Sequence, residues 1–177
     1  SARLGHTMPA FFRALERRGA FLVAYNDKND VTPQSVAKAA WACATLNRPA
    51  PNLFGAILPR LEWLATHGTA LDLAHIVWAF ARLGHTKPSL SAALEPTLLA
   101  AIENRADWLV ARASPEEISN TVWAFAKLRC KSPTLVKAIA SRADWLVNHG
   151  SPRDVAHTAW AFAVLRHTSS QASSTAF

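Results

Sequence analysis

The sequence Trp-Ala-Phe-Ala occurs three times in this chain, at residues 78–81, 123–126 and 160–163, and Trp41-Ala42-Cys43-Ala44 is a degenerate fourth copy. The first residues of consecutive copies are 37, 45 and 37 positions apart, and 45 is 37 plus an eight-residue insertion. A period of this length is typical of stacked helical units that together build one continuous core. The chain is therefore predicted to be a repeat protein whose function lies on a surface that recurs in every unit.

A second aromatic residue keeps the same period. Trp63, Trp108 and Trp145 each lie 15 residues before the next Trp of the motif, and Phe21 holds the same place 20 residues before Trp41. Each of these four aromatics follows a proline by 12 residues, at Pro9, Pro51, Pro96 and Pro133. Because apolar residues recur at helical intervals between the proline and the aromatic, this segment predicts the first helix of each unit, helix A.

The second helix of each unit, helix B, begins at a capping motif. Ser114-Pro115-Glu116-Glu117 and Ser151-Pro152-Arg153-Asp154 place a hydroxyl at the N-cap, a proline at the first helical position and an acid three residues after the cap. Thr69 with Asp72, and Thr32 with Ser35, are weaker versions of this motif. Helix B carries the Trp-Ala-Phe-Ala motif and is apolar around most of its circumference, so its Trp residues, at 41, 78, 123 and 160, are expected in the core.

These patterns predict an all-α fold, an α-solenoid of stacked helix-turn-helix hairpins with about 37 residues per repeat. The whole of residues 1–168 is expected to form one array. Its parts are the end of one repeat at 1–8 and full repeats at 9–50, 51–87, 88–132 and 133–168, of which the third carries the eight-residue insertion. Residues 2–7 have the same sequence as residues 81–86 and are interpreted as the end of an earlier helix B. Residues 169–177 are interpreted as a Ser-rich tail.

Composition narrows the class of protein. Hydrophobic residues make up 50% of the chain, yet no apolar run approaches the roughly 20 residues that a membrane helix needs, so no membrane insertion is expected. The two cysteines have no partner at zinc-ligand spacing, and the chain has no phosphate-binding glycine loop and no catalytic constellation. We therefore expect no metal, no cofactor and no enzymatic activity. A net charge of +7 and a pI near 10.1 favour an acidic partner, most often nucleic acid.

The run Trp-Ala-Phe-Ala-Lys-Leu at residues 123–128, the preceding Ile-Ser-Asn-Thr-Val, and the spacing from proline to Trp resemble the octotricopeptide and heptatricopeptide repeat family. The resemblance covers about residues 2–168. It implies a helical-hairpin array in a mitochondrion or plastid that processes, stabilises or helps to translate organellar RNA. Members often end in a RAP domain, which nothing after Leu165 resembles, and the first unit departs from the pattern at Phe21 and Cys43.

One basic column is constant among the units. Three residues before the helix A aromatic lie Arg18, Arg60, Arg105 and Arg142. In a stack of hairpins these guanidinium groups would form a ladder that meets successive phosphates or bases. The alternative is a structural salt bridge to the acids that cap helix B, namely Asp72, Glu117 and Asp154. Both interpretations stay open from sequence.

Base discrimination needs polar columns that vary from unit to unit. Three residues before the helix B Trp lie Lys38, His75, Asn120 and His157. On helix A, the basic members of two variable columns are Arg13, Arg17 and Lys137. These residues, together with the Arg column, are the candidate RNA-binding residues. For the variable columns the alternative is simple solvent exposure, and His75 and His157 could instead lie at a helix packing seam.

Two functions follow as hypotheses. The first is a helical-repeat module that binds single-stranded or ribosomal RNA in a mitochondrion or plastid, serving processing, stabilisation, translation or ribosome assembly. The alternative is a non-enzymatic scaffold subunit that binds other proteins in a large organellar complex, such as a ribosome or a membrane-associated assembly. Four units are few for autonomous base reading at roughly one base per unit, which favours a docked role.

Overall fold

The computed structural model describes residues 2–25, 31–84 and 100–174, and the side chains of residues 10–25, 31–83 and 100–166. Every regular element in these ranges is helical, so the all-α prediction is confirmed. The predicted eight-residue insertion at 88–95 lies outside the described residues.

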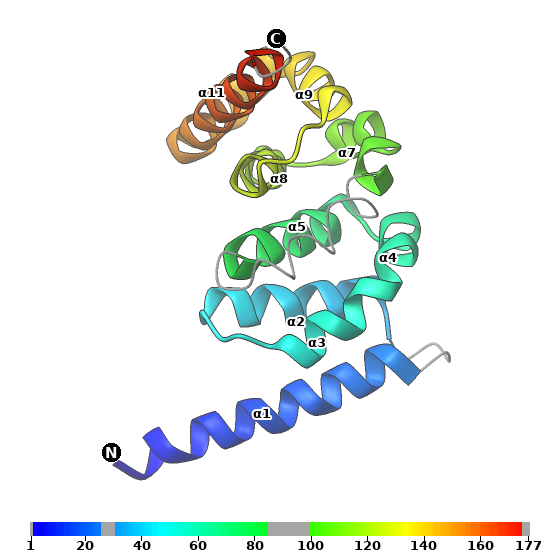
Figure 1. Cartoon of the computed structure of the whole chain (residues 1–177), viewed down its shortest axis with the longest axis vertical. Helices are drawn as coiled ribbons and strands as arrows, with labels where there is room; N and C mark the ends of the chain where they lie inside the picture. Colours follow the sequence, from blue (N-terminus) through cyan, green and yellow to red (C-terminus); the bar gives the residue numbers. More distant parts are fainter. Residues whose placement is uncertain (1, 26–30, 85–99, 175–177) are drawn as a thin grey trace.

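The B helices form one layer of the molecule (Figure 1). They are α2 (Pro33–Thr45), α5 (Ala70–Gly84), α8 (Pro115–Leu128) and α11 (Pro152–Ser174), and each packs on the next in chain order. Helix α11 continues to Ser174, so the segment that was predicted to be a tail begins as helix.

The caps that start the B helices are those the sequence predicts. Complete capping boxes begin α2 at Thr32 with Ser35 and α8 at Ser114 with Glu117. At α11 the Asp154 carboxylate accepts hydrogen bonds from the backbone N–H and the hydroxyl of Ser151, at 3.0 and 2.7 Å. Because these bonds satisfy backbone groups that a helix start leaves open, they fix where each helix B begins.

The A helices form the second layer. They are α1 (Ala2–Tyr25), α3 (Pro51–Ile57) with the 3-10 turn η1 (Leu58–Arg60) and α4 (Leu61–His67), α7 (Ala106–Arg112), and α9 (Pro133–Ala140) with α10 (Ala143–His149). Helix α1 runs through Pro9 without a break, although an interior proline removes one backbone hydrogen bond. Residues 2–8 therefore continue helix A of the first unit, and the predicted boundary between residues 8 and 9 is not seen.

Helix A of the later units is broken at its repeated arginine. Arg60, Arg105 and Arg142 directly precede α4, α7 and α10, with φ of −104°, −117° and −112° and ψ of 5°, 11° and 17°. These angles lie in the sparsely populated bridge region, outside the helical well. Where a single helix A was expected, these units therefore change direction at the arginine.

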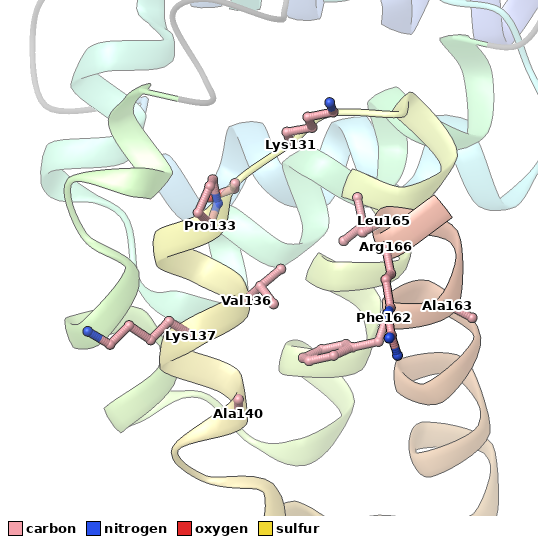
Figure 2. Close-up of a pocket in the computed structure, with 10 residues that line it drawn as sticks. Lys131, Pro133, Val136, Lys137, Ala140, Phe162, Ala163, Leu165 and Arg166 are labelled. Carbon is pink, nitrogen blue, oxygen red and sulfur yellow. The ribbon is translucent and has the colours of Figure 1, made fainter. Parts of the chain in front are cut away.

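The seam between helix A and helix B of one unit is closed by two side chains. In the second unit Phe54 and Phe80 meet edge to face, with ring centroids 4.7 Å apart. Cys43 replaces the second phenylalanine in the first unit, and a cavity of about 390 Å³ lies beside it. In the last unit Val136 stands where the second unit has Phe54. An opening of about 600 Å³ separates α9 from α11 there, and the Phe162 ring extends from α11 toward α9 (Figure 2).

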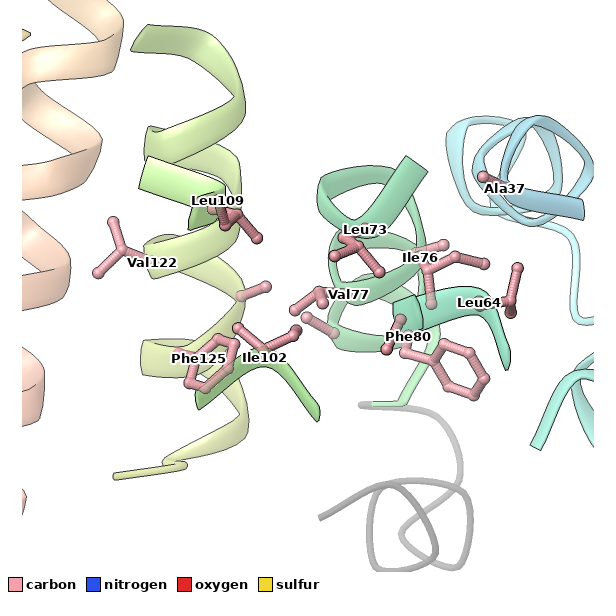
Figure 3. Close-up of a cluster of buried hydrophobic side chains, with 14 of the residues drawn as sticks. Ala37, Leu64, Leu73, Ile76, Val77, Phe80, Ile102, Leu109, Val122 and Phe125 are labelled. Atoms are coloured by element: carbon pink, nitrogen blue, oxygen red, sulfur yellow. The ribbon is translucent and has the colours of Figure 1, made fainter. Parts of the chain in front are cut away.

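The core between the two layers contains the Phe of the Trp-Ala-Phe-Ala motif. Phe80 and Phe125 are fully buried among side chains from both layers, including Ile76 and Leu109 (Figure 3). The expectation that all four motif Trp residues are core is wrong for Trp41 and Trp160, which remain 41% and 42% exposed, whereas Trp78 and Trp123 are half-buried against the core.

The half-buried Trp78 and Trp123 show the reason. Residues three before and four after a helical position share its face, and around these Trp residues they are polar. Three residues before Phe80 and Phe125 lie Val77 and Val122, which are buried, so the phenylalanine faces the core and the indole lies at its margin.

Candidate nucleic-acid interface

The indole rings of the B layer lie against histidines of the following unit. The ring centroids of Trp41 on α2 and His75 on α5 are 5.5 Å apart, with the ring planes inclined by 34°. Those of Trp123 on α8 and His157 on α11 are 6.3 Å apart and inclined by 27°. Each contact crosses from one B helix to the next, so the rings lie along the layer rather than within one helix.

Cations lie over three indoles of the B layer, those of Trp78, Trp123 and Trp160. The Arg82 guanidinium carbon lies 5.2 Å from the Trp78 centroid. The Lys127 ammonium lies 5.5 Å from the Trp123 centroid and 5.1 Å from that of Trp160, all within the range of attraction between a cation and an aromatic face. We call this row of side chains the Trp–His stripe; its members are Trp41, His75, Trp78, Arg82, Trp123, Lys127, His157 and Trp160.

The variable polar column contributes His75 and His157 to this stripe, and its other members are Lys38 and Asn120. Lys38 is exposed, whereas His75, Asn120 and His157 are half-buried. Burial lowers the pKa of His75 below its ordinary value of 6.5, and Lys38 lowers it further, against the opposing effect of Asp72 and the two glutamates that start α8. His75 therefore favours the neutral imidazole, and its Nδ1 is buried without a hydrogen-bond partner.

The constant Arg column of the A layer is arranged differently. Each arginine lies over the aromatic ring three residues later in its own helix A. The distances from guanidinium carbon to ring centroid are 5.3 Å for Arg18, 5.5 Å for Arg60, and 3.6 Å for both Arg105 and Arg142. The two shortest distances indicate a guanidinium stacked flat on the indole.

Arg142 also joins two units, because its Nη1 donates a hydrogen bond to the Val110 carbonyl oxygen of the preceding helix A. The acids considered as salt-bridge partners bind elsewhere. Asp72 accepts from Thr69, and Asp154 accepts from Ser151 and from the Ser119 hydroxyl of α8. Burial raises the pKa of Asp154, but the hydrogen bonds from Ser151 and Ser119 outweigh it and hold this pKa below its ordinary value. Each member of the Arg column thus packs on an aromatic ring of its own helix A, and Arg142 also binds a carbonyl oxygen of the preceding unit.

The remaining predicted residues are not brought together. Arg13 and Arg17 are exposed on α1, and Lys137 is exposed on α9, at the other end of the molecule (Figure 1). Arg13 borders the cavity beside Cys43, and Lys137 borders the opening between α9 and α11 (Figure 2).

Sequence reasoning missed two cations of the stripe, Arg82 and Lys127. The signal was present, since both lie four residues after a motif Trp and therefore share its helical face.

No three His, Cys, Asp or Glu side chains in the described ranges gather as metal ligands would. No helix in this part of the chain has the length and apolar character that crossing a membrane requires. Compared with known proteins, the chain matches no family model, no curated protein and no solved structure.

Proposed function

We propose that this chain is an α-solenoid, with about 37 residues per repeat, that binds single-stranded or ribosomal RNA in a mitochondrion or plastid. The observation that carries the proposal is the Trp–His stripe, in which successive units contribute an indole and a cationic or imidazole group to one row. Proteins that hold single strands combine stacking rings with positive charge, and each stacked base contributes roughly 1 to 3 kcal/mol. The net charge of +7 supports the same partner.

The stripe is a better candidate than the Arg column. Arg105 and Arg142 stack on their own indoles, so a base or phosphate would have to displace contacts that already hold helix A. Trp41 and Trp160 instead keep about two fifths of their surface exposed, at 41% and 42%. Such rings offer a face to a base without rearrangement of the helices.

Salt-dependent binding of a fluorescent single-stranded RNA tests this proposal. Each lost phosphate contact lowers the slope of log affinity against log salt by ~0.7 for a single strand. The stripe pair of changes replaces Lys127 of the stripe and the exposed Lys38 of the variable polar column by Gln, and it should reduce this slope. Trp160→Ala should weaken binding roughly 5- to 100-fold with little change of slope.

A matched pair of changes on the A layer is Arg13→Gln with Lys137→Gln, which removes the same charge from exposed positions. We expect this pair to leave the slope unchanged. If the A-layer pair flattens the slope and the stripe pair does not, RNA binds the other layer and the assignment to the stripe is wrong.

The alternative function is a non-enzymatic scaffold subunit of a large organellar complex. The exposure of large apolar side chains, such as Phe11, Tyr25 and Val147, favours a protein partner. If the wild-type chain has no measurable affinity for any single strand or rRNA fragment, the RNA-binding proposal is wrong and the scaffold function takes its place.

A further inference from the structure

Each helix A has a face toward the preceding unit, which we call its leading face. Its markers are the positions ten and six residues before the helix A aromatic. They are buried in the second and last units as Leu53, Ile57, Leu135 and Ile139. A Cβ built at Gly19 of α1 would lie 3.6 Å from the Leu53 Cδ1 atom, so this face abuts the preceding helix A.

The opposite side of helix A, its trailing face, contacts the following unit. Its marker is the residue two after the aromatic. Val23, Ala65 and Val110 hold this position in the first three units, and all are buried. The Val110 carbonyl oxygen accepts the hydrogen bond of Arg142, so the contact includes backbone as well as apolar side chains.

Helix B also has a leading face and a trailing face. Its trailing face includes the last alanine of the motif, buried as Ala44, Ala81 and Ala126 in the first three units. The Ala44 carbonyl oxygen accepts a hydrogen bond from the Arg82 Nε of the next helix B, at 2.9 Å. Its leading face includes the leucine five residues after the motif Trp, which is buried as Leu83 and Leu165.

Both ends of the described array leave one of these faces open. At the first unit the leading face is exposed, with Phe11 at 56%, Leu15 at 50% and Leu46 at 53%. At the last unit the trailing face is exposed, because Val147 is 59% exposed where Val110 is 2% exposed, and Ala163 is exposed as well. The two open surfaces are therefore the two halves of the contact that joins every pair of neighbouring units.

We propose that this chain associates head to tail with a second copy of itself. The leading face of the first unit of one copy docks on the trailing face of the last unit of the other, so the contact continues the interface that already exists between units. In this arrangement Arg18 occupies the place of Arg142, and it donates to the Val147 carbonyl oxygen of the second copy as Arg142 donates to that of Val110. Both exposed faces are covered by one kind of contact.

A second copy fits better than a symmetric pairing of like ends. The trailing face is lined by small residues, with Ala156, Ala159 and Ala163 exposed on α11, whereas Phe11, Leu15 and Leu46 of the leading face are large. A head-to-tail contact joins two different surfaces, so each added copy leaves one surface open for the next. The assembly stops growing only where the rotation from copy to copy closes a ring.

Sedimentation velocity of the nuclease-treated 177-residue chain, over increasing protein concentration, tests the proposal. Wild type should grow with concentration beyond a dimer without RNA. Val147→Asp blocks the trailing end and Leu15→Asp blocks the leading end, because each buries an unpaired carboxylate in an apolar contact. Each change should raise the dissociation constant more than about tenfold. Asn148→Asp adds the same charge at a column that is exposed in every unit, and should change nothing.

Mixing the two blocked variants gives the sharpest result. Leu15→Asp keeps an intact trailing end and Val147→Asp an intact leading end, so the mixture should form a 1:1 dimer and nothing larger. Circular dichroism verifies that each variant is folded, and Leu46→Asp replaces Leu15→Asp if that chain unfolds. A wild type that stays monomeric at every concentration overturns the proposal, and so does a dimer that Val147→Asp breaks while neither leading-end variant does. Neither outcome depends on whether RNA binds.

Discussion

The two helix layers use the same pair of groups, a cation and an indole, in opposite ways. In the A layer the cation and the ring belong to one helix, and Arg142 lies 3.6 Å over the Trp145 centroid while donating to the preceding unit. In the B layer a cation also lies over the indole of its own helix, but Lys127 of α8 lies over Trp160 of the neighbouring α11 as well as over Trp123. Trp108 and Trp145 of the A layer are half-buried and covered by their own arginines, whereas Trp41 and Trp160 of the B layer remain 41% and 42% exposed.

This difference shows that recurrence alone does not mark a binding surface. The arginine before the helix A aromatic is the same in all four units, and in each of them it lies over that aromatic ring. The polar position beside the stripe holds Lys, His, Asn and His, so it is free to differ. A position that is constant among units is better explained by the contact between units, and a variable polar position by what lies outside the molecule.

The largest effect is expected beneath the stripe. Phe125→Ala removes a ring that is 1% exposed and should lower the free energy of unfolding by about 3 to 5 kcal/mol. Trp160→Ala, two fifths exposed at 42%, should lower it by about 1 kcal/mol, mostly through the lost contact with Lys127. Urea unfolding of the two variants measures both values. Equal losses would mean that the stripe is core after all and would undo the comparison.

Much of the fold could be predicted from sequence because its signals are local. The period, the proline spacing and the caps at Ser114 and Ser151 depend on residues that are close in the chain, and the helix B starts were placed correctly. The places of Trp and Phe could not be separated by apolar character alone, since both lie on a nearly all-apolar helix. The polar neighbours of Trp78, three residues before it and four after it, carried that information.

The break in helix A and the partner of its arginine were not predictable in this way. Nothing in the sequence near Arg142 indicates that its guanidinium reaches the Val110 carbonyl oxygen. Every residue type has a backbone carbonyl group, so the identity of residue 110 gives no signal, and this residue is 32 positions away in the chain. The candidate site was therefore predicted in part. His75 and His157 were identified, but their stacking partners in the neighbouring unit depend on how the B helices pack.

A smaller effect is expected in the A layer. Arg142→Gln removes the indole stack and the bond to the Val110 carbonyl oxygen, and should lower the free energy of unfolding by about 1 to 2 kcal/mol. Lys137→Gln, on the exposed side of the same helix A, is the matched control and should leave stability within about 0.5 kcal/mol of wild type. Thermal melts at low and high salt compare them. If the Arg142 variant melts like wild type, the constant column has no structural role and its recurrence must be explained by binding.

The smallest expected effect on stability comes from His75, the stripe residue whose pKa is influenced by Lys38, Asp72 and the two glutamates that start α8. Burial lowers the pKa of His75 from 6.5 in the folded chain, so the unfolded chain binds more protons as the pH falls through this value. His75 should therefore reduce stability as the pH drops below about 6.5 and have no such effect at pH 8. The His75→Gln variant lacks this titration, so its melting temperature should rise relative to that of wild type between about pH 6.5 and pH 5. The difference between the two chains isolates His75 from the other histidines. A difference that stays constant from about pH 8 to pH 5 would mean that His75 is as well solvated as in the unfolded chain, and the stripe would then be open at this position too.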